Sequence, residues 1–219
     1  MRAAIVIGLA AMVAGCGGPN LSFSVRAGAP KAPGTALAAG TGINVSRVRV
    51  VIRKVELEKA GTLEMDEVAS GPYLLDLQEA ALDAGTVFPV ADSSFTPGTY
   101  SEIKLEVHKA DSTDQGVNAS LADMIAANAS IIVDGTIDGA TFQFVSAVNQ
   151  DQKTEGNIVL KDGSNLTLKV DPSGWFTSNG ARLDPTNEAN RSQIENNIQN
   201  SLKAFQDDNE DGRDDSGLL

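Results

Sequence analysis

The run Pro97-Gly98-Thr99-Tyr100-Ser101-Glu102-Ile103-Lys104-Leu105-Glu106-Val107-His108 is the clearest structural signal in the chain. It opens with a Pro-Gly turn pair and then alternates polar and apolar residues, which is the pattern of a half-buried β-strand. The apolar positions are Ile103, Leu105 and Val107, and the polar positions are Tyr100, Glu102, Lys104, Glu106 and His108. We therefore expect a central strand of an antiparallel sheet, with one dry face and one solvated face.

Outward from this run, the chain contains ten strand candidates, eight or nine of them short, with turns about every ten residues, which is typical of a β-sandwich. Asp134-Gly135 and Asp162-Gly163 are hairpin signals. Residues 121–127 predict one or two turns of helix, and residues 78–92 predict a loop with a short strand. The strand candidates cover residues 21–26, 43–59, 63–68, 73–77, 87–90, 97–108, 129–133, 141–148, 157–160 and 165–170.

The longest candidate, Ile43–Lys59, changes the parity of its apolar residues twice. Keeping those residues on one face requires one extra residue at each change, which predicts bulges near Ser46-Arg47 and Arg53-Lys54. Three arginines then lie on the solvated face, where they are ordinary solvated charges or partners of acidic residues in the 97–108 strand. The residues concerned are Arg47, Arg49, Arg53, Glu102 and Glu106.

One helix is expected after the β part, over residues 184–206. Asp184 is the predicted cap and Pro185 lies in the predicted first turn. The apolar stripe comprises Ile194, Ile198, Leu202 and Phe205. The predicted fold class is therefore mainly β, an antiparallel β-sandwich over residues 21–176 followed by one C-terminal α-helix and an acidic tail over 207–219.

The N-terminus predicts a lipoprotein. A basic Arg2 precedes a short apolar run, and Val13-Ala14-Gly15-Cys16 resembles a bacterial lipobox. Residues 1–15 are then a signal peptide, and Cys16, the only cysteine, carries lipid at the head of a tether over 16–20. The alternative is an ordinary secretory signal with a chance cysteine. Because Gly17 rather than Asp follows Cys16, we expect anchoring in the outer membrane.

Charge narrows the range of partners. Without Arg2 the chain has 16 basic and 29 acidic side chains, a net charge of −13. Nucleic acid is therefore excluded as a partner on charge, whereas cations are favoured. Only 5% of residues are aromatic against 42% hydrophobic, so the core is expected to be mostly aliphatic.

Three segments together carry a resemblance. These are the long strand over 45–57, the element Gly71-Pro72-Tyr73-Leu74-Leu75-Asp76-Leu77 and the start Pro97-Gly98-Thr99-Tyr100. In this order they resemble a family of bacterial cell-surface lipoproteins with a β-sandwich domain of unknown function. The resemblance covers about residues 43–170. It implies a sandwich at the cell surface and no reaction.

Catalytic chemistry has little support in the residue content. His108 is the only histidine, so a Ser-His-Asp triad would have to use it, and zinc motifs with several histidines are excluded. We therefore expect a non-enzymatic structural or interaction domain with a protein or glycan partner at the cell surface. The alternative is a carbohydrate- or ligand-binding module in which Trp175 stacks on a sugar, and a hydrolase is a distant third. Trp175 is otherwise expected to close one end of the sandwich.

The acidic C-terminus predicts a calcium site. Counted from Asp207, oxygen-bearing residues occupy positions 1, 3, 5 and 9 and Gly212 occupies position 6, as in the first part of an EF-hand loop. The backbone carbonyl at position 7 supplies a further ligand. The bidentate glutamate is missing, because position 12 is Leu218, so only weak Ca²⁺ binding is expected. The candidate ligands are Asp207, Asn209, Asp211, Arg213 and Asp215. The alternative is a solvated acidic tail.

Overall fold

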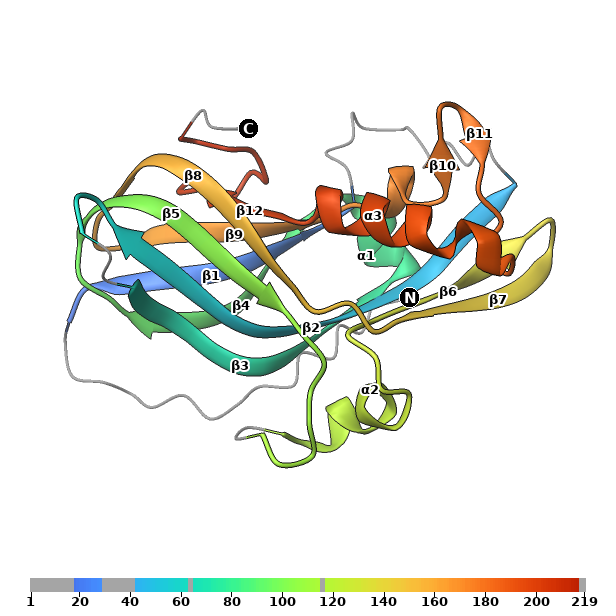
Figure 1. Ribbon diagram of the computed structural model, residues 1–219. Helices are drawn as coiled ribbons and strands as arrows, with labels where there is room; N and C mark the ends of the chain where they lie inside the picture. Colours follow the sequence, from blue (N-terminus) through green and yellow to red (C-terminus); the bar gives the residue numbers. More distant parts are fainter. Residues whose placement is uncertain (1–17, 29–41, 63–64, 115–116, 217–219) are drawn as a thin grey trace.

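The computed structural model describes residues 18–28, 42–62, 65–114 and 117–216. It is mainly β, with 52% strand and 18% helix. Two large sheets face each other, and α3 (Arg191–Ser201) runs lengthwise along one side of the sandwich, in one half of the molecule (Figure 1). The predicted fold class, a β-sandwich with a C-terminal helix, is confirmed. The signal peptide, Cys16 and most of the predicted tether fall within residues 1–17, outside the described residues.

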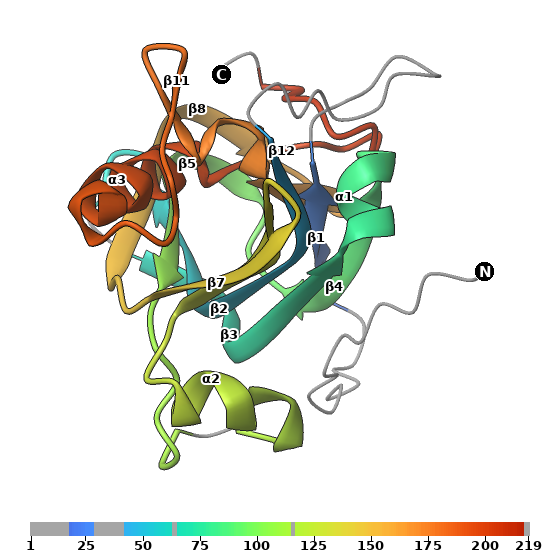
Figure 2. The ribbon, with the colours of Figure 1, turned by 90° about the vertical axis from the view of Figure 1, so that its right-hand side faces the viewer.

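The first sheet has the strand order β12-β9-β1-β4 and the second has β7-β6-β2-β5-β8, with β3 also paired to β2. Seen end-on, their strands surround a shared interior (Figure 2). The strands of the first sheet are β1 (Asn20–Ala27), β4 (Val87–Ser94), β9 (Ser164–Val170) and β12 (Lys203–Gln206). Those of the second are β2 (Ile43–Lys59), β3 (Met65–Gln78), β5 (Gly98–Val107), β6 (Ile131–Ile137), β7 (Ala140–Ser146) and β8 (Gln150–Leu160).

Strand β2 connects most of the second sheet. It pairs with β6 along its first half, with β5 along its second half and with β3 along most of its length. The pairing register shifts between Val45 and Arg47 and again between Ile52 and Lys54, so both predicted bulges are confirmed. Each extra residue keeps the apolar side chains of β2 in the interior.

Strand β5 lies between β2 and β8, as the alternating pattern predicted. Ile103, Leu105 and Val107 are buried in the interior. The prediction for Tyr100 is wrong, because this residue was expected on the solvated face and is fully buried. The register against β8 shifts between Tyr100 and Glu102, which reverses the face of the residues before the shift. The buried Tyr100 hydroxyl donates a hydrogen bond to the Thr96 carbonyl.

Several turns differ from the sequence expectations. Asp134-Gly135, a predicted hairpin turn, lies inside β6. The β6–β7 hairpin turns instead at Asp138-Gly139. Asp138 and Gly139 both have a positive φ, as a type I′ turn requires. Gly135 serves packing, because a Cβ there would meet the Phe142 ring at 2.9 Å. The turn at Asp162-Gly163 exists, but it carries the chain from the second sheet to the first rather than forming a hairpin. Strand β9 then pairs with β1 in parallel, which no local pattern indicated.

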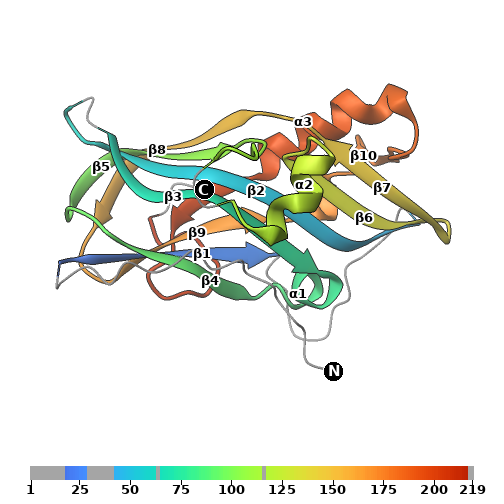
Figure 3. The same cartoon turned by 90° about the horizontal axis from the view of Figure 1, so that it is seen from below.

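The segments predicted as strands 63–68 and 73–77 form one strand, β3, that continues through Gly71-Pro72. Residues 63 and 64 lie outside the described residues. The predicted loop 78–92 instead contains the short helix α1 (Glu79–Ala84), ended by Gly85 in the left-handed conformation, and then β4. The expected helical turns near residue 121 are present as a 3₁₀ turn and α2 (Ala122–Ala126). Helix α2 covers the outer side of the second sheet (Figure 3).

The C-terminal helix is shorter than predicted. It runs from Arg191 to Ser201 after a 3₁₀ turn, and Ile194 and Ile198 are its buried residues. The Asp184 side chain accepts a hydrogen bond from the amide of Thr186, so it closes a turn rather than capping the helix. Leu202 is extended and Phe205 belongs to β12, because pairing with the edge of β9 satisfies this segment's backbone groups.

Candidate functional site

The C-terminal segment after β12 folds back over the outer face of the first sheet. The Asp207 amide donates to the Asn165 carbonyl on β9, and the Asp215 amide returns to the Gln206 carbonyl. These two hydrogen bonds close residues 206–215 into a compact loop, which we call the C-terminal loop. All five predicted calcium ligands lie on this loop. They are brought together by turns within the loop and also by its hydrogen bond to β9, a distant strand.

Asp207 anchors the loop and is fully buried. Its Oδ1 accepts a hydrogen bond from the Asp211 amide at 3.0 Å, and its Oδ2 accepts from the Gly212 amide at 3.0 Å and from the Thr167 hydroxyl at 2.8 Å. Burial raises the pKa of Asp207, while the hydrogen bonds from Thr167, Gly212 and Asp211 oppose that rise. The first position of the loop is thus held in a single orientation.

The other candidate ligands bend the loop back on itself. Asn209 Oδ1 accepts from the Asp211 amide and Asp211 Oδ1 accepts from the Arg213 amide, each at 2.9 Å. Asp215 accepts from the backbone and side-chain nitrogens of Asn209, both at 3.3 Å. Gly212 has a φ of 78°, which permits the sharp turn. The side chains at positions 1, 3, 5 and 9 are therefore gathered in one turn, while Leu218 lies outside the described residues.

Sequence reasoning missed the residues beneath the loop. Arg26, buried on β1, donates a hydrogen bond to the Gly212 carbonyl and lies over the Phe205 ring, 5.8 Å from its centroid. Burial lowers the pKa of Arg26, and Asp171 and Asp207 oppose this. Asn165 donates from Nδ2 to the Asp207 carbonyl at 3.0 Å. The alternation of polar and apolar residues along β1 and β9 places these polar side chains on the outer face of the first sheet. They are buried because the C-terminal loop covers that face.

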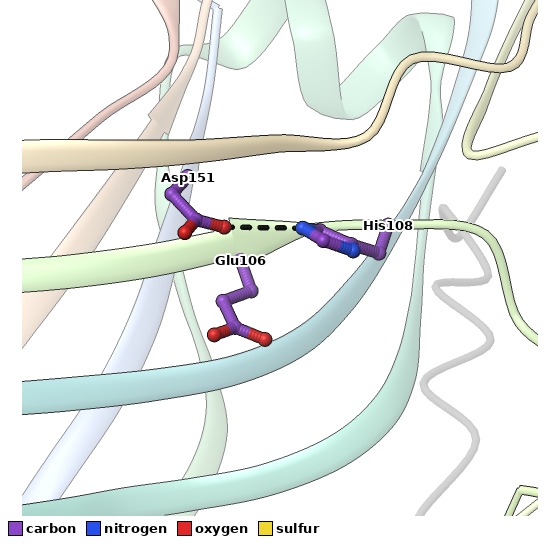
Figure 4. A group of neighbouring side chains, drawn as sticks. All are labelled: Glu106, His108 and Asp151. Atoms are coloured by element: carbon purple, nitrogen blue, oxygen red, sulfur yellow. Dashed lines mark hydrogen bonds and ion pairs between the residues drawn. The ribbon is translucent and has the colours of Figure 1, made fainter.

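A second group of charged residues lies on the outer face of the second sheet, around the only histidine (Figure 4). His108 Nε2 lies 3.1 Å from Asp151 Oδ1. Lys104 Nζ lies 2.8 Å from Glu106 Oε1, 3.2 Å from Asp151 Oδ2 and 3.2 Å from Glu56 Oε2. The hydrogen bond with Glu106 is the main cause that raises the pKa of Lys104, burial opposes it, and Glu56 and Asp151 add to the rise.

Within the part of the chain that the structure describes, the three arginines of β2 form no ion pair with Glu102 or Glu106, so that alternative is wrong. Glu102 pairs with Lys153 instead. The reason is register, because Glu102 and Glu106 face the second half of β2, whereas Arg47 and Arg49 face β3 and β6. The observed ion pairs are Arg47–Asp76 at 2.6 Å, Arg49–Asp134 at 2.8 Å and Arg53–Asp114 at 2.5 Å. The other alternative, ordinary solvated charges, does not hold for Arg49, which is buried.

Trp175 is fully buried, so it presents no ring face for stacking on a sugar. Its Nε1 donates to the Ser201 hydroxyl at the end of α3, at 2.6 Å. Its ring belongs to the main core between the two sheets. The structure therefore corrects the ligand-binding expectation for Trp175 and agrees with the alternative, in which this residue closes the sandwich beneath the helix.

Comparison with family models, with curated proteins and with solved structures finds no match for this chain. The resemblance to surface lipoproteins therefore stays a prediction from sequence. None of the helices in the described part of the chain is long and apolar enough to cross a membrane. What the geometry itself defines is a β-sandwich with a C-terminal helix, an acidic loop on one sheet and a charged group around His108 on the other.

Proposed function

We propose that this chain is a lipid-anchored protein of the bacterial envelope, most simply of the outer membrane, with a non-catalytic structural or interaction domain. The lipobox-like Val13–Cys16 supports the anchor. Four residue steps separate Cys16 from Asn20, the first residue of β1, a span of at most about 14 Å. The end of the sandwich where β1 begins would then lie close to the membrane surface.

Metabolic labelling tests the anchor. We expect palmitate to label the wild-type protein and to be absent from Cys16→Ser, because Cys16 is the only cysteine available for acylation. Cys16→Ser should also leave the membrane fraction, since the remaining short apolar run cannot span a bilayer. Persistent label in the variant would refute the lipoprotein assignment.

The C-terminal loop is proposed as a weak Ca²⁺ site. The observation that carries this proposal is the convergence of Asp207, Asn209, Asp211 and Asp215 in one turn closed by backbone hydrogen bonds. A hard cation binds several oxygens that converge in this way. Because α3 ends at Ser201, bound calcium would stabilise the junction between β12 and the loop, not a last helical turn near Phe205.

Calorimetric titration of Ca²⁺ tests this proposal. We expect wild-type protein to bind with a dissociation constant of about 10⁻⁴ to 10⁻³ M, because the bidentate carboxylate of position 12 is missing. Asp211→Asn should weaken binding clearly. Asp214→Asn removes the same charge at position 8, which supplies no ligand in this type of loop, and should bind like wild type. Equal isotherms for the wild type and Asp211→Asn would exclude the loop as a site, as would equal loss in both variants.

The non-catalytic assignment rests on the setting of His108, whose imidazole is part of a network of ion pairs on an outer sheet face. We expect no turnover of common ester, peptide or glycoside substrates. Hydrolysis by the wild type that disappears in His108→Ala would contradict this. The carbohydrate-binding alternative has lost its main support, since Trp175 is buried.

A further inference from the structure

The second charged group brings together ligands of a kind that the C-terminal loop does not contain. Glu106, His108 and Asp151 each offer one donor atom, and these atoms all lie within 4.8 Å of one another. His108 Nε2 and Asp151 Oδ1 are 3.1 Å apart, and Figure 4 shows both facing each other above Glu106. A separation of this order is what two ligands share when each lies about 2.0–2.2 Å from one metal ion.

The strand pairing fixes this arrangement. Glu106 on β5 is the direct cross-strand partner of Asp151 on β8. His108 follows the end of β5, where the amide of Lys109 donates to Asn149 Oδ1 just before β8 and ties the two strands together. The three ligands therefore come from backbone held at both strands, and little chain ordering is needed for an ion to join them.

We propose that Glu106, His108 and Asp151 form a binding site for a divalent transition-metal ion of the Zn²⁺ type. One imidazole nitrogen and two carboxylate oxygens suit such ions, whereas Ca²⁺ prefers oxygen ligands alone. The His108 and Asp151 side chains are 29% and 41% exposed, so water can complete the coordination and the ion can enter from solvent. The site is separate from the C-terminal loop, since the two lie on different sheets.

Lys104 is the residue that most affects this site. Its Nζ contacts Glu106 Oε1 and Asp151 Oδ2, and the His108 contact uses the other oxygen of Asp151, Oδ1. Lys104 thus orients both carboxylates in the way that outer-shell partners orient metal ligands. Three carboxylates and two ammonium groups surround the site, which gives it a net charge of −1 and so favours an incoming cation. They are Glu56, Glu106, Asp151, Lys54 and Lys104. Repulsion from Lys104 makes the expected affinity moderate.

Because His108 is the only histidine, ¹⁵N-histidine labelling of the full chain produces a single imidazole to follow by NMR. We expect Zn²⁺ to shift the Nε2 resonance of the wild type. Asp151→Asn should require at least about tenfold more Zn²⁺ for the same shift. Substitution of a residue that only orients a ligand already weakens metal binding by about 10–100-fold, and Asp151 is proposed as a ligand itself. Glu155→Gln is the matched control, because Glu155 is an exposed carboxylate on the same strand outside the cluster, and it should titrate like wild type.

Two outcomes would overturn the site. One is an Nε2 resonance that does not move at millimolar Zn²⁺. The other is equal midpoints for Asp151→Asn and Glu155→Gln, which would mean that the imidazole binds metal without the cluster. Asp211→Asn, which alters the C-terminal loop, should leave the Zn²⁺ midpoint unchanged, and a large change there would also contradict a separate site.

Discussion

At the scale of single residues, Gly212 is the position where the C-terminal loop and the sandwich meet. Its φ is 78°, and a Cβ added there would lie 2.5 Å from Arg26 Cδ. Replacement by alanine therefore combines backbone strain with a clash against a buried side chain. We expect Gly212→Ala to lower the free energy of unfolding by about 1–3 kcal/mol, measured by urea denaturation monitored with Trp175 fluorescence.

Gly163 provides the matched control for this change. It has nearly the same φ, 79°, but a Cβ there meets nothing within 4 Å. Gly163→Ala should therefore show the cost of the left-handed backbone alone, about 1 kcal/mol. If the two variants lose the same stability, contact between Gly212 and Arg26 does not hold the loop in place.

At the scale of elements, the outward faces of β2, β5 and β8 form a network of ion pairs centred on Lys104. Burial tends to raise the pKa of Glu56, but Lys54 and Lys104 outweigh it and hold that pKa below its usual range. For Asp151, burial has the same tendency, and His108 and Lys104 reverse it. Lys104 stays protonated, because its own pKa is raised. The network is thus most favourable when its carboxylates are ionised.

The sign of the pH dependence follows from these shifts. A carboxyl group whose pKa is lower in the folded state adds stability that is complete above its unfolded pKa, about 4, and is lost as the pH falls through the folded value. Wild-type protein should therefore lose stability between pH 6 and pH 3. We expect Asp151→Asn to lose less stability than the wild type over this range. The measurement is the midpoint of urea denaturation of each protein at pH 6 and at pH 3.

Glu155→Gln again serves as the control, since among the described residues Glu155 forms no ion pair, and it should follow the wild-type pH dependence. An Asp151→Asn protein with the full wild-type loss would show that the network on β5 and β8 does not contribute to acid sensitivity. Since the Asp151 side chain is 41% exposed, the effect is expected to shrink at high salt.

Element boundaries show where local pattern and tertiary context disagree. The stripe Ile194, Ile198, Leu202 and Phe205 has helical spacing, yet only its first two residues lie in α3. The last two, Leu202 and Phe205, are buried just before and within β12, which pairs with β9 as the fourth strand of the first sheet. Asn, Gln and Ser dominate the other positions of α3, so intrinsic helix propensity is weak and pairing with the sheet prevails.

At the scale of the whole molecule, the sandwich is organised by two strands that each join several others. Strand β2 pairs with three neighbours in the second sheet, and β1 lies between β4 and β9 in the first. One apolar core fills the space between the sheets, and a smaller one lies between α2 and the outer side of the second sheet. The two candidate ion sites lie on the outer faces of the two sheets, and so outside this shared core, to which β8 adds the buried polar residues Gln152 and Thr154.

The sequence by itself determined the β class, two of the register shifts along β2, the burial of Ile103, Leu105 and Val107 on β5, the bounds of β2 and the gathering of acidic residues near Asp207. All of these follow from side-chain periodicity and turn chemistry, which act over a few residues. Only the tertiary structure decided the parallel pairing of β1 with β9, the partners of Arg47 and Arg49, the burial of Trp175 and the support of the C-terminal loop by Arg26. These depend on which distant strands become neighbours and on what covers each face, and burial and register across a sheet are set by such long-range pairing.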